Sequence, residues 1–132
     1  IFSTSQENIL RRKNDLKLLK ISIKKKIPIL CVCYGFQYVV KLLGGKVIKS
    51  KREIKKNHYI YVNKKRLNVN SFHNYSVKEL PKYFEIIGVH KDNYIEIAYS
   101  KKLKLLCTMF HPERKNISQK HVNNLIFKYL KL

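Results

Sequence analysis

The sequence has 132 residues, the length of one domain, and 45% of them are apolar, which is enough for a buried core. No apolar run approaches the roughly 20 residues of a membrane span, and the three cysteines do not make a disulfide framework. The net charge is +21, but the lysines are scattered, so nucleic acid is not the expected partner. We expect one cytoplasmic domain, residues 1–132, without a membrane segment, and keep a non-catalytic basic binding module as an alternative.

The first part of the chain predicts the order helix, strand, helix. Residues 1–8 are polar and have no clear period, whereas residues 9–26 carry apolar side chains at helical spacing. Residues 27–32 are uncharged and rich in β-branched side chains, which is typical of a strand buried on both faces. Residues 34–43 return to helical spacing, and the following Gly-Gly pair ends that helix.

The second part of the chain alternates apolar and polar residues, which predicts β-hairpins, and then returns to a strand and a helix. The expected elements are a short strand at 46–48, a surface loop at 49–57, hairpins at 58–62 with 66–70 and at 84–89 with 94–99, a strand at 103–109 and a helix at 117–130. Residues 71–75 and 78–81 predict irregular structure. The mixture indicates an α/β core with an antiparallel extension.

Cys33 lies at the joint between the predicted buried strand and the helix that follows it. A nucleophile at such a joint is lifted out of the sheet on a tight turn, as in a nucleophile elbow. The first amides of the helix and its dipole favour a thiolate there. Gly35 is expected to keep the space beside the sulfur open. The alternative is an inert cysteine of the core.

A cysteine nucleophile needs a base, and His111 is the strongest candidate among the five histidines. It follows an apolar strand directly, and Pro112 favours a turn at that point. Glu113 lies two residues on, where its carboxylate can hold the imidazole in one tautomer. Cys33, His111 and Glu113 would then act as nucleophile, base and orienting group. A surface turn after a strand is the alternative for the His-Pro-Glu stretch.

These motifs together resemble those of class I glutamine amidotransferases. Residues 28–37, Pro-Ile-Leu-Cys-Val-Cys-Tyr-Gly-Phe-Gln, are similar to the nucleophile motif Pro-x-Leu-Gly-x-Cys-x-Gly-x-Gln of that family. Residues 110–113, Phe-His-Pro-Glu, resemble its Trp-His-Pro-Glu, and residues 69–75, Val-Asn-Ser-Phe-His-Asn-Tyr, resemble the Val-Asn-Ser-x-His-His stretch of the γ-glutamyl hydrolase branch. The chain departs from the pattern at Cys31 and Cys107, where the family has glycine.

The resemblance implies a flavodoxin-like α/β fold, with a mostly parallel sheet flanked by helices and an antiparallel hairpin extension. It also implies that the first strands of the family domain, and a loop that completes the oxyanion hole, are absent from this chain. We therefore expect the 132 residues alone to be inactive or poorly folded.

The resemblance also assigns roles to residues. Cys33 would form a γ-glutamyl thioester, His111 would activate the thiol and protonate the leaving amine, and Glu113 would orient His111. Six residues would bind the substrate or the oxyanion: Tyr34, Gly35, Gln37, Ser71, His73 and Asn74. A histidine held for structural reasons is the alternative for His73. No metal and no cofactor are expected.

The function that follows from the resemblance is hydrolysis of a γ-glutamyl amide bond, in glutamine or in a γ-glutamyl conjugate. A nucleotide-linked conjugate is favoured because the chain is basic. The alternative within the family is a glutaminase subunit that delivers ammonia to a synthase partner.

Overall fold

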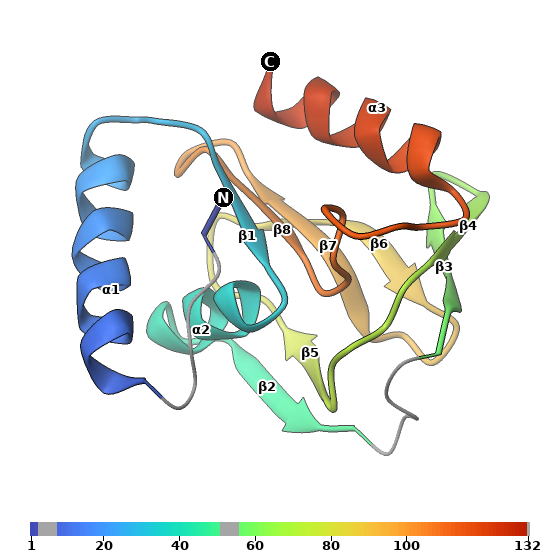
Figure 1. Ribbon diagram of the computed structural model, residues 1–132, viewed down its shortest axis with the longest axis horizontal. Coiled ribbons are helices and arrows are strands. Elements are labelled where there is room, and N and C mark those ends of the chain that lie inside the picture. The colour runs from blue at the N-terminus through green and yellow to red at the C-terminus, as the bar shows by residue number, and fades with distance from the viewer. Residues whose placement is uncertain (3–7, 51–55, 132) are drawn as a thin grey trace.

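The computed structural model describes residues 1–2, 8–50 and 56–131, which contain three helices and eight strands (Figure 1). In chain order the elements are α1 (Ile9–Lys24), β1 (Ile29–Val32), α2 (Tyr34–Leu42), β2 (Lys46–Lys49), β3 (His58–Val62), β4 (Lys65–Val69), β5 (Tyr75–Glu79), β6 (Glu85–His90), β7 (Ile95–Ser100), β8 (Leu105–Thr108) and α3 (Gln119–Leu130). The predicted α/β class is confirmed.

The eight strands form one mixed sheet. Its main path is β1-β8-β7-β6-β3-β4, and β2 joins through β5, which pairs with β7. Of the pairings between these described strands, the one between β1 and β8 is parallel and the others are antiparallel. The prediction of a mostly parallel sheet is therefore wrong for the described strands. Short turns join most of the strands after β2, whereas parallel neighbours need a long crossover connection.

Helices cover both faces of the sheet around β1 and β8. In Figure 1, α1 and α2 lie on one side and α3 on the other. Alternate residues of β1 serve the two faces: Ile29 and Cys31 pack with Leu19 of α1 and Phe36 of α2, whereas Leu30 and Val32 pack with α3. Because both faces of β1 are buried, every residue of this strand is apolar.

One strand was not expected from the sequence. Residues 75–79 form β5, which pairs antiparallel with β2. The stretch is short and ends in Lys78 and Glu79, so its own pattern is weak, and its pairing with β2 and β7 gives it strand structure. The first hairpin turn is also tighter than expected. It consists of Asn63 and Lys64, both with positive φ, and this is the geometry of a two-residue hairpin turn.

The N-terminal residues extend the sheet beyond β1. Phe2 forms a parallel bridge with Cys31. Its N–H donates to the Leu30 carbonyl at 2.6 Å, and its carbonyl accepts from the Val32 N–H at 2.9 Å. A Cβ at Gly35 would overlap the Phe2 carbonyl oxygen. Gly35 therefore admits this backbone rather than opening space beside the sulfur. The expected absence of the family's first strands stays a prediction, because Phe2 forms an isolated bridge and not a strand. The expected absence of the oxyanion-hole loop also stays a prediction, and residues 3–7 lie outside the described residues.

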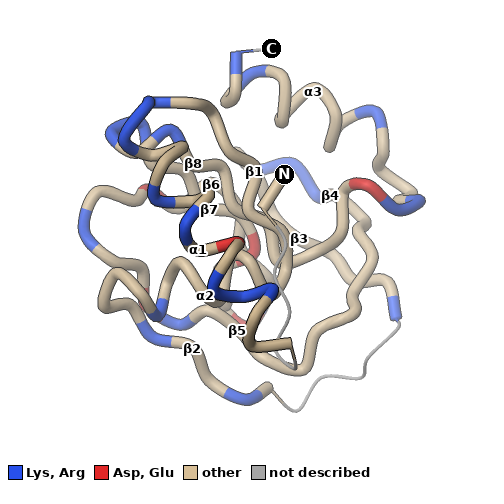
Figure 2. The backbone as a smooth tube through the Cα atoms, turned by 60° about the vertical axis from the view of Figure 1, so that its left-hand side comes forward, with Lys and Arg blue, Asp and Glu red and all other residues tan. Residues whose placement is uncertain are grey.

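Basic residues are distributed around the fold. In Figure 2, Lys and Arg lie along the helices and in turns on several sides of the backbone, with few acidic positions between them. None of the helices in the described residues combines the length and the apolar character that a membrane crossing requires.

Candidate functional site

Cys33 occupies a sharp turn between β1 and α2. Its φ of 50° and ψ of −108° are unusual for a residue with a side chain, and such a conformation persists only when its surroundings hold it. The Cys33 N–H donates to the Thr108 carbonyl at the end of β8 (2.8 Å), and its own carbonyl accepts from the Gln37 N–H in α2 (3.1 Å). These bonds fix both sides of the turn, so the predicted elbow geometry is confirmed.

The Cys33 thiol is neutral in the free protein. Burial raises its pKa to about 11, and the carboxylates of Glu113 and Glu96 act in the same direction. The Tyr34 N–H, which bonds to the sulfur, and the nearby Arg114 lower the pKa but do not offset the burial. The helix amide acts in the expected direction, but burial has the larger effect on the pKa. A cysteine with such a pKa needs a base before its sulfur can act as a nucleophile.

The raised pKa predicts how Cys33 reacts with iodoacetamide in the absence of substrate. The thiolate is the reacting form, so the alkylation rate is expected to rise about tenfold per pH unit from pH 7 to about pH 10. The measurement is the rate of carboxamidomethylation at Cys33, followed by mass spectrometry. A free thiol such as glutathione serves as control, and its rate should level off near pH 8.5–9. A plateau for Cys33 below pH 8 would show that a thiolate is present in the resting protein.

His111 and Glu113 are paired in the turn after β8. The His111 Nδ1 lies 2.6 Å from Glu113 Oε1. Because a carboxylate only accepts, the proton of a neutral imidazole resides on Nδ1, and Nε2 is left as the basic atom. The Glu113 side chain is 42% exposed, whereas that of His111 is 12% exposed. The predicted pairing of the two side chains is present in the structure.

Two buried asparagines hold the backbone of this turn, and sequence reasoning did not identify them. The Asn70 side chain accepts from the His111 N–H (2.9 Å) and donates to the His111 carbonyl (2.8 Å). Asn116 donates to the same carbonyl (3.1 Å) and accepts from the Asn70 N–H (2.9 Å). The signal available in the sequence was the Asn of the Val-Asn-Ser stretch. These bonds fix the His111 backbone from two directions.

Cys33 and the turn that carries His111 are attached to the same strand end. The Thr108 carbonyl accepts from Cys33 N–H, and the Thr108 hydroxyl donates to the Phe110 carbonyl (3.0 Å), one residue before His111. Within the described residues no hydrogen bond joins the Cys33 sulfur to His111. Contacts of this kind often tighten only when substrate binds.

A pocket of about 180 Å³ opens beside the Cys33 side chain. Seven residues line it: Cys33, Tyr34, Gln37, Phe72, His73, Asn74 and Tyr75. Four of the six predicted pocket residues are thus present. Gly35 is turned toward Phe2, and Ser71 is buried outside the lining. Phe72 and Tyr75 were missed because an aromatic side chain in an irregular stretch carries no signal of its own.

His73 contributes to the pocket without offering a free ring nitrogen. Its Nδ1 lies 2.7 Å from the Tyr75 carbonyl, and its Nε2 faces the Glu96 carboxylate at 3.9 Å. The alternative given above, a histidine held for structural reasons, therefore fits His73 better than a direct contact with substrate.

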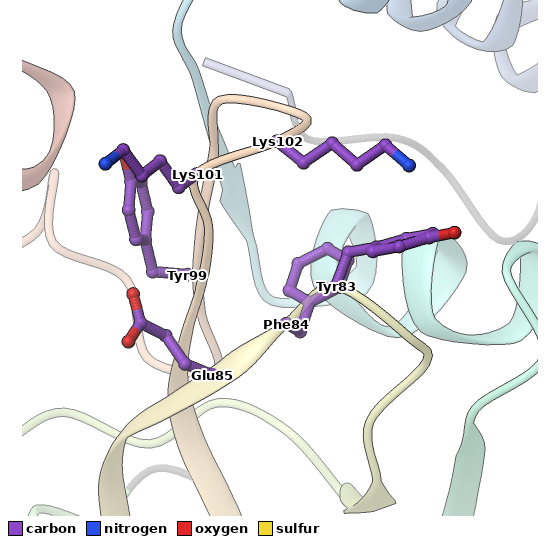
Figure 3. A pocket seen from close by; sticks show the side chains of 6 residues that line it. All are labelled: Tyr83, Phe84, Glu85, Tyr99, Lys101 and Lys102. Atoms are coloured by element: carbon purple, nitrogen blue, oxygen red, sulfur yellow. The ribbon is translucent and has the colours of Figure 1, made fainter.

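A larger hollow of about 510 Å³ lies elsewhere, between β6 and the turn after β7 (Figure 3). Aromatic and basic side chains line it, and Lys102 Nζ lies 3.6 Å from the centre of the Tyr83 ring. None of its lining residues is Cys or His. It therefore lacks a nucleophile and a base, and the pocket beside Cys33 is the candidate site.

The family Glutamine amidotransferase class-I matches residues 3–131. The chain belongs to the class I glutamine amidotransferase family.

Individual relatives lie in several branches of this family. The chain is 30% identical over 112 residues to a gamma-glutamyl-CDP-amidate hydrolase of Campylobacter jejuni, covering 83% of this chain and 56% of the relative. It is 33% identical over 109 residues to anthranilate synthase component 2 of Helicobacter pylori, covering 76% of this chain and 55% of the relative. It is 39% identical over 109 residues to the glutamine-hydrolysing GMP synthase of Wigglesworthia glossinidia brevipalpis, covering 69% of this chain and 21% of the relative. The chain thus spans about half the length, or less, of these relatives.

Solved structures agree on the fold. A glutamine amidotransferase from Thermotoga maritima superimposes with a TM-score of 0.70 at 22% identity, covering 94% of this chain and 56% of that one. A glutamine amidotransferase from Methylobacillus flagellatus gives a TM-score of 0.69 at 14% identity, covering 96% and 53%. The α/β arrangement described above is therefore that of glutamine amidotransferase structures.

Proposed function

We propose that the protein hydrolyses a γ-glutamyl amide bond through a thioester at Cys33, within one domain that includes residues 1–132. The observation that carries the proposal is the attachment of a strained cysteine turn and a His111–Glu113 pair to the same end of β8. Membership of the family supports it.

The chemistry follows from the proton on His111. With Nδ1–H donated to Glu113, the Nε2 atom removes the Cys33 proton as the sulfur attacks the γ-carbonyl carbon. The tetrahedral intermediate collapses when His111 returns that proton to the leaving nitrogen, which departs as an amine or ammonia. A water molecule, deprotonated by the same Nε2, then cleaves the thioester to release glutamate and the free thiol.

The developing oxyanion needs hydrogen-bond donors near the sulfur. The Tyr34 N–H already bonds to the Cys33 sulfur, and the N–H of the residue after the nucleophile is a usual oxyanion donor. We propose this amide, with that of Gly35, as part of the oxyanion hole. Gln37, His73 and Asn74 form the wall that receives the glutamyl group.

We propose further that the leaving group carries phosphate, as in a nucleotide-linked γ-glutamyl amide. The Arg114 guanidinium lies over the Phe72 ring at 4.4 Å, at the rim of the pocket, and close enough to lower the pKa of Cys33. A cation there suits an anionic leaving group. The Campylobacter jejuni relative, a gamma-glutamyl-CDP-amidate hydrolase, supports this substrate class.

The test compares glutamate release from a cytidine-diphosphate-linked γ-glutamyl amide and from glutamine. The nucleotide conjugate is expected to give the higher kcat/KM. Replacing Arg114 with Gln should lower that value by roughly tenfold to a hundredfold, with a much smaller loss on glutamine from the raised pKa of Cys33. Lys115→Gln, one residue on and exposed, serves as the matched control. Equal losses on both substrates would contradict the assignment of Arg114 to the leaving group.

The second candidate is a glutaminase subunit that supplies ammonia to a synthase partner. The relatives named anthranilate synthase component 2 and GMP synthase favour it. In that case glutamine is the better substrate, and its turnover rises when the partner is added. A hydrolase acts at its full rate alone.

A further inference from the structure

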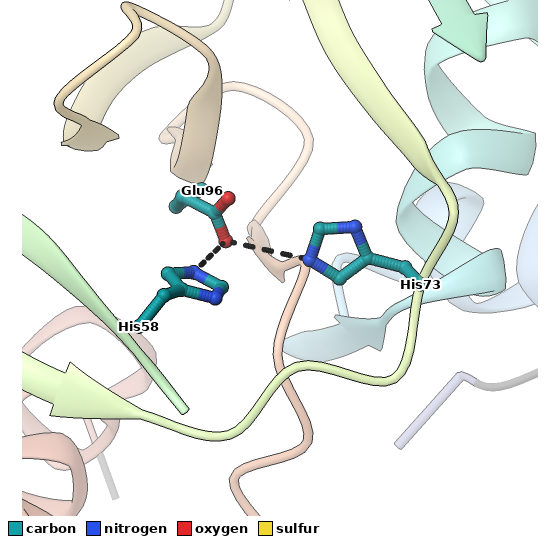
Figure 4. Close-up of side chains that lie close together, drawn as sticks. All are labelled: His58, His73 and Glu96. Carbon is teal, nitrogen blue, oxygen red and sulfur yellow. Dashed lines mark ion pairs between the residues drawn. The ribbon is translucent and has the colours of Figure 1, made fainter. Parts of the chain in front are cut away.

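A buried polar cluster lies behind the wall of the Cys33 pocket. It consists of His58 at the start of β3, Glu96 on β7 and His73 in the connection from β4 to β5 (Figure 4). His58 Nε2 lies 3.3 Å from Glu96 Oε2, and His73 Nε2 lies 3.9 Å from the same oxygen. Glu96 is 1% exposed and His73 is 2% exposed. We refer to these three residues as the Glu96 cluster.

The position of Glu96 is unusual for a carboxylate. Its neighbours on β7, Ile95, Ile97 and Ala98, are all buried and apolar. A charged group in such surroundings is strongly unfavourable unless positive charge or hydrogen-bond donors compensate it. An apolar side chain would fill the site at lower cost, so the carboxylate is expected to serve a purpose beyond packing.

The ring of His73 shows where protons must lie. Its Nδ1 is 2.7 Å from the Tyr75 carbonyl oxygen. A carbonyl only accepts, so Nδ1 carries a hydrogen and donates it. The Nε2 atom then faces Glu96 Oε2, and the contact is attractive only if a proton resides on one of the two atoms. His58 Nε2 faces the same oxygen, so two imidazole rings lie against one carboxylate at ion-pair distances.

Other titratable groups surround the cluster. The His90 ring of β6 meets the His58 ring edge-on with centroids 5.3 Å apart, and Asp92 Oδ2 lies 3.3 Å from His90 Nδ1. On the side of the pocket, the charge of Glu96 acts on the Cys33 thiol. Any pH dependence measured for the cluster therefore includes these groups.

The Glu96 cluster is connected to both parts of the candidate site. The loop at residues 70–75, which carries His73, supplies Phe72, Asn74 and Tyr75 to the pocket wall. Phe72 also meets the His111 ring edge-on, with centroids 5.6 Å apart. In addition, the Glu96 carbonyl accepts from the Met109 N–H (2.9 Å), two residues before His111. The cluster thus supports the pocket wall and the strand end that bears the base.

We propose that Glu96 is a positioning residue: its carboxylate, together with His58, fixes the His73 ring and thereby holds the loop at residues 70–75 in the shape that binds the γ-glutamyl group. The proposal rests on the proposed function. It adds a residue on β7 that does not touch the substrate and that sequence reasoning did not identify.

The same three side chains are also of the types that bind zinc. An ion bonded at about 2.1 Å to each donor in tetrahedral geometry holds its donors roughly 3.4 Å apart. The contact between His73 and Glu96 is 3.9 Å, wider than that spacing. The distances therefore fit ion pairs between the imidazoles and the carboxylate better than a shared metal, and a bound metal becomes an outcome of the test.

The experiment compares Glu96→Gln with the wild type in the full-length protein. The variant keeps the shape of the side chain but removes its charge. We expect KM for the γ-glutamyl substrate to rise by roughly tenfold to a hundredfold with a smaller change in kcat. We also expect the downfield ¹H NMR signal of the His73 Nδ1–H, seen in the wild type, to shift or disappear. Glu79→Gln, an exposed glutamate paired with Lys46, is the matched control and should change neither.

Three results would overturn the proposal. A Glu96→Gln protein with a lowered Tm but unchanged KM and an unchanged imidazole signal would show that Glu96 serves stability alone. A loss confined to kcat, with KM unchanged, would place its effect on the chemistry instead. One equivalent of a divalent metal in the wild type, absent from Glu96→Gln, would make the cluster a metal site.

Two further measures keep the test decisive. If Glu96→Gln does not fold, His58→Gln provides the same comparison, since the His58 side chain is 13% exposed and lies at the margin of the cluster. If the wild type turns over no γ-glutamyl substrate, the proposed function is wrong, and the NMR comparison still decides whether Glu96 fixes His73.

Discussion

Replacing Cys33 with alanine is expected to abolish γ-glutamyl hydrolysis, with a loss in kcat of at least about 10⁴-fold. Every step of the proposed mechanism passes through a bond to its sulfur, and the pocket proposed to hold the glutamyl group opens at this residue. The measurement is glutamate release under saturating substrate, with Tm recorded for each protein. The fold should persist, because the turn is held by backbone hydrogen bonds to Thr108 and Gln37.

The matched control for this variant is Cys31→Ala. Cys31 lies two residues earlier on β1, fully buried beside Cys107 on the neighbouring strand, and it does not line the pocket. Its replacement should lower stability slightly and leave kcat within a few-fold of the wild type. Comparable losses in the two variants would mean that the core under the turn, and not the sulfur of Cys33, limits activity.

Replacing His111 with asparagine is expected to lower kcat by about 10²–10⁴-fold, with a much smaller effect on KM. The Cys33 thiol has a pKa of about 11 in the free protein, so it depends on a base for deprotonation more than a cysteine with an unperturbed pKa would. The hydrogen bonds from Asn70 and Asn116 reach the backbone of residue 111 and survive the substitution. The measurement is steady-state kcat and KM at pH 7 and at pH 9.

A partial recovery of kcat in His111→Asn at pH 9 would agree with the loss of a base, because hydroxide in solution then removes the thiol proton. The matched control is His121→Asn, which replaces an exposed histidine of α3 and should leave kcat and KM unchanged. Unchanged kcat in His111→Asn would exclude His111 as the base and would direct attention to the remaining buried histidines.

The parts of the site that were predictable from the sequence are local. The turn at Cys33 is encoded within about ten residues by an apolar strand, a helical period and its glycine stop. Glu113 follows His111 by two residues in a turn, so their contact needs little information from the rest of the fold. The helices and the two hairpins depend in the same way on short periodic patterns.

The parts that were not predictable depend on pairings between distant segments. Strand β5 exists because β2 and β7 pair with it, and its own residues indicate a turn. Burial by the assembled fold sets the pKa of Cys33, and this outweighs the local amide that a sequence reading emphasises. Asn70 and Glu96 act on residues far away in the chain, and a lone polar residue in a strand pattern gives no indication of its partner.

The central claim is that Cys33 is a nucleophile toward a γ-glutamyl carbonyl. The most direct test treats the full-length protein with a glutamine-like diazo ketone and locates the adduct by mass spectrometry, beside Cys33→Ala. The account predicts one adduct, at Cys33, which excess γ-glutamyl amide prevents and which Cys33→Ala lacks. No adduct, or equal labelling at Cys31 and Cys107, would contradict the account and favour a basic binding module without this chemistry.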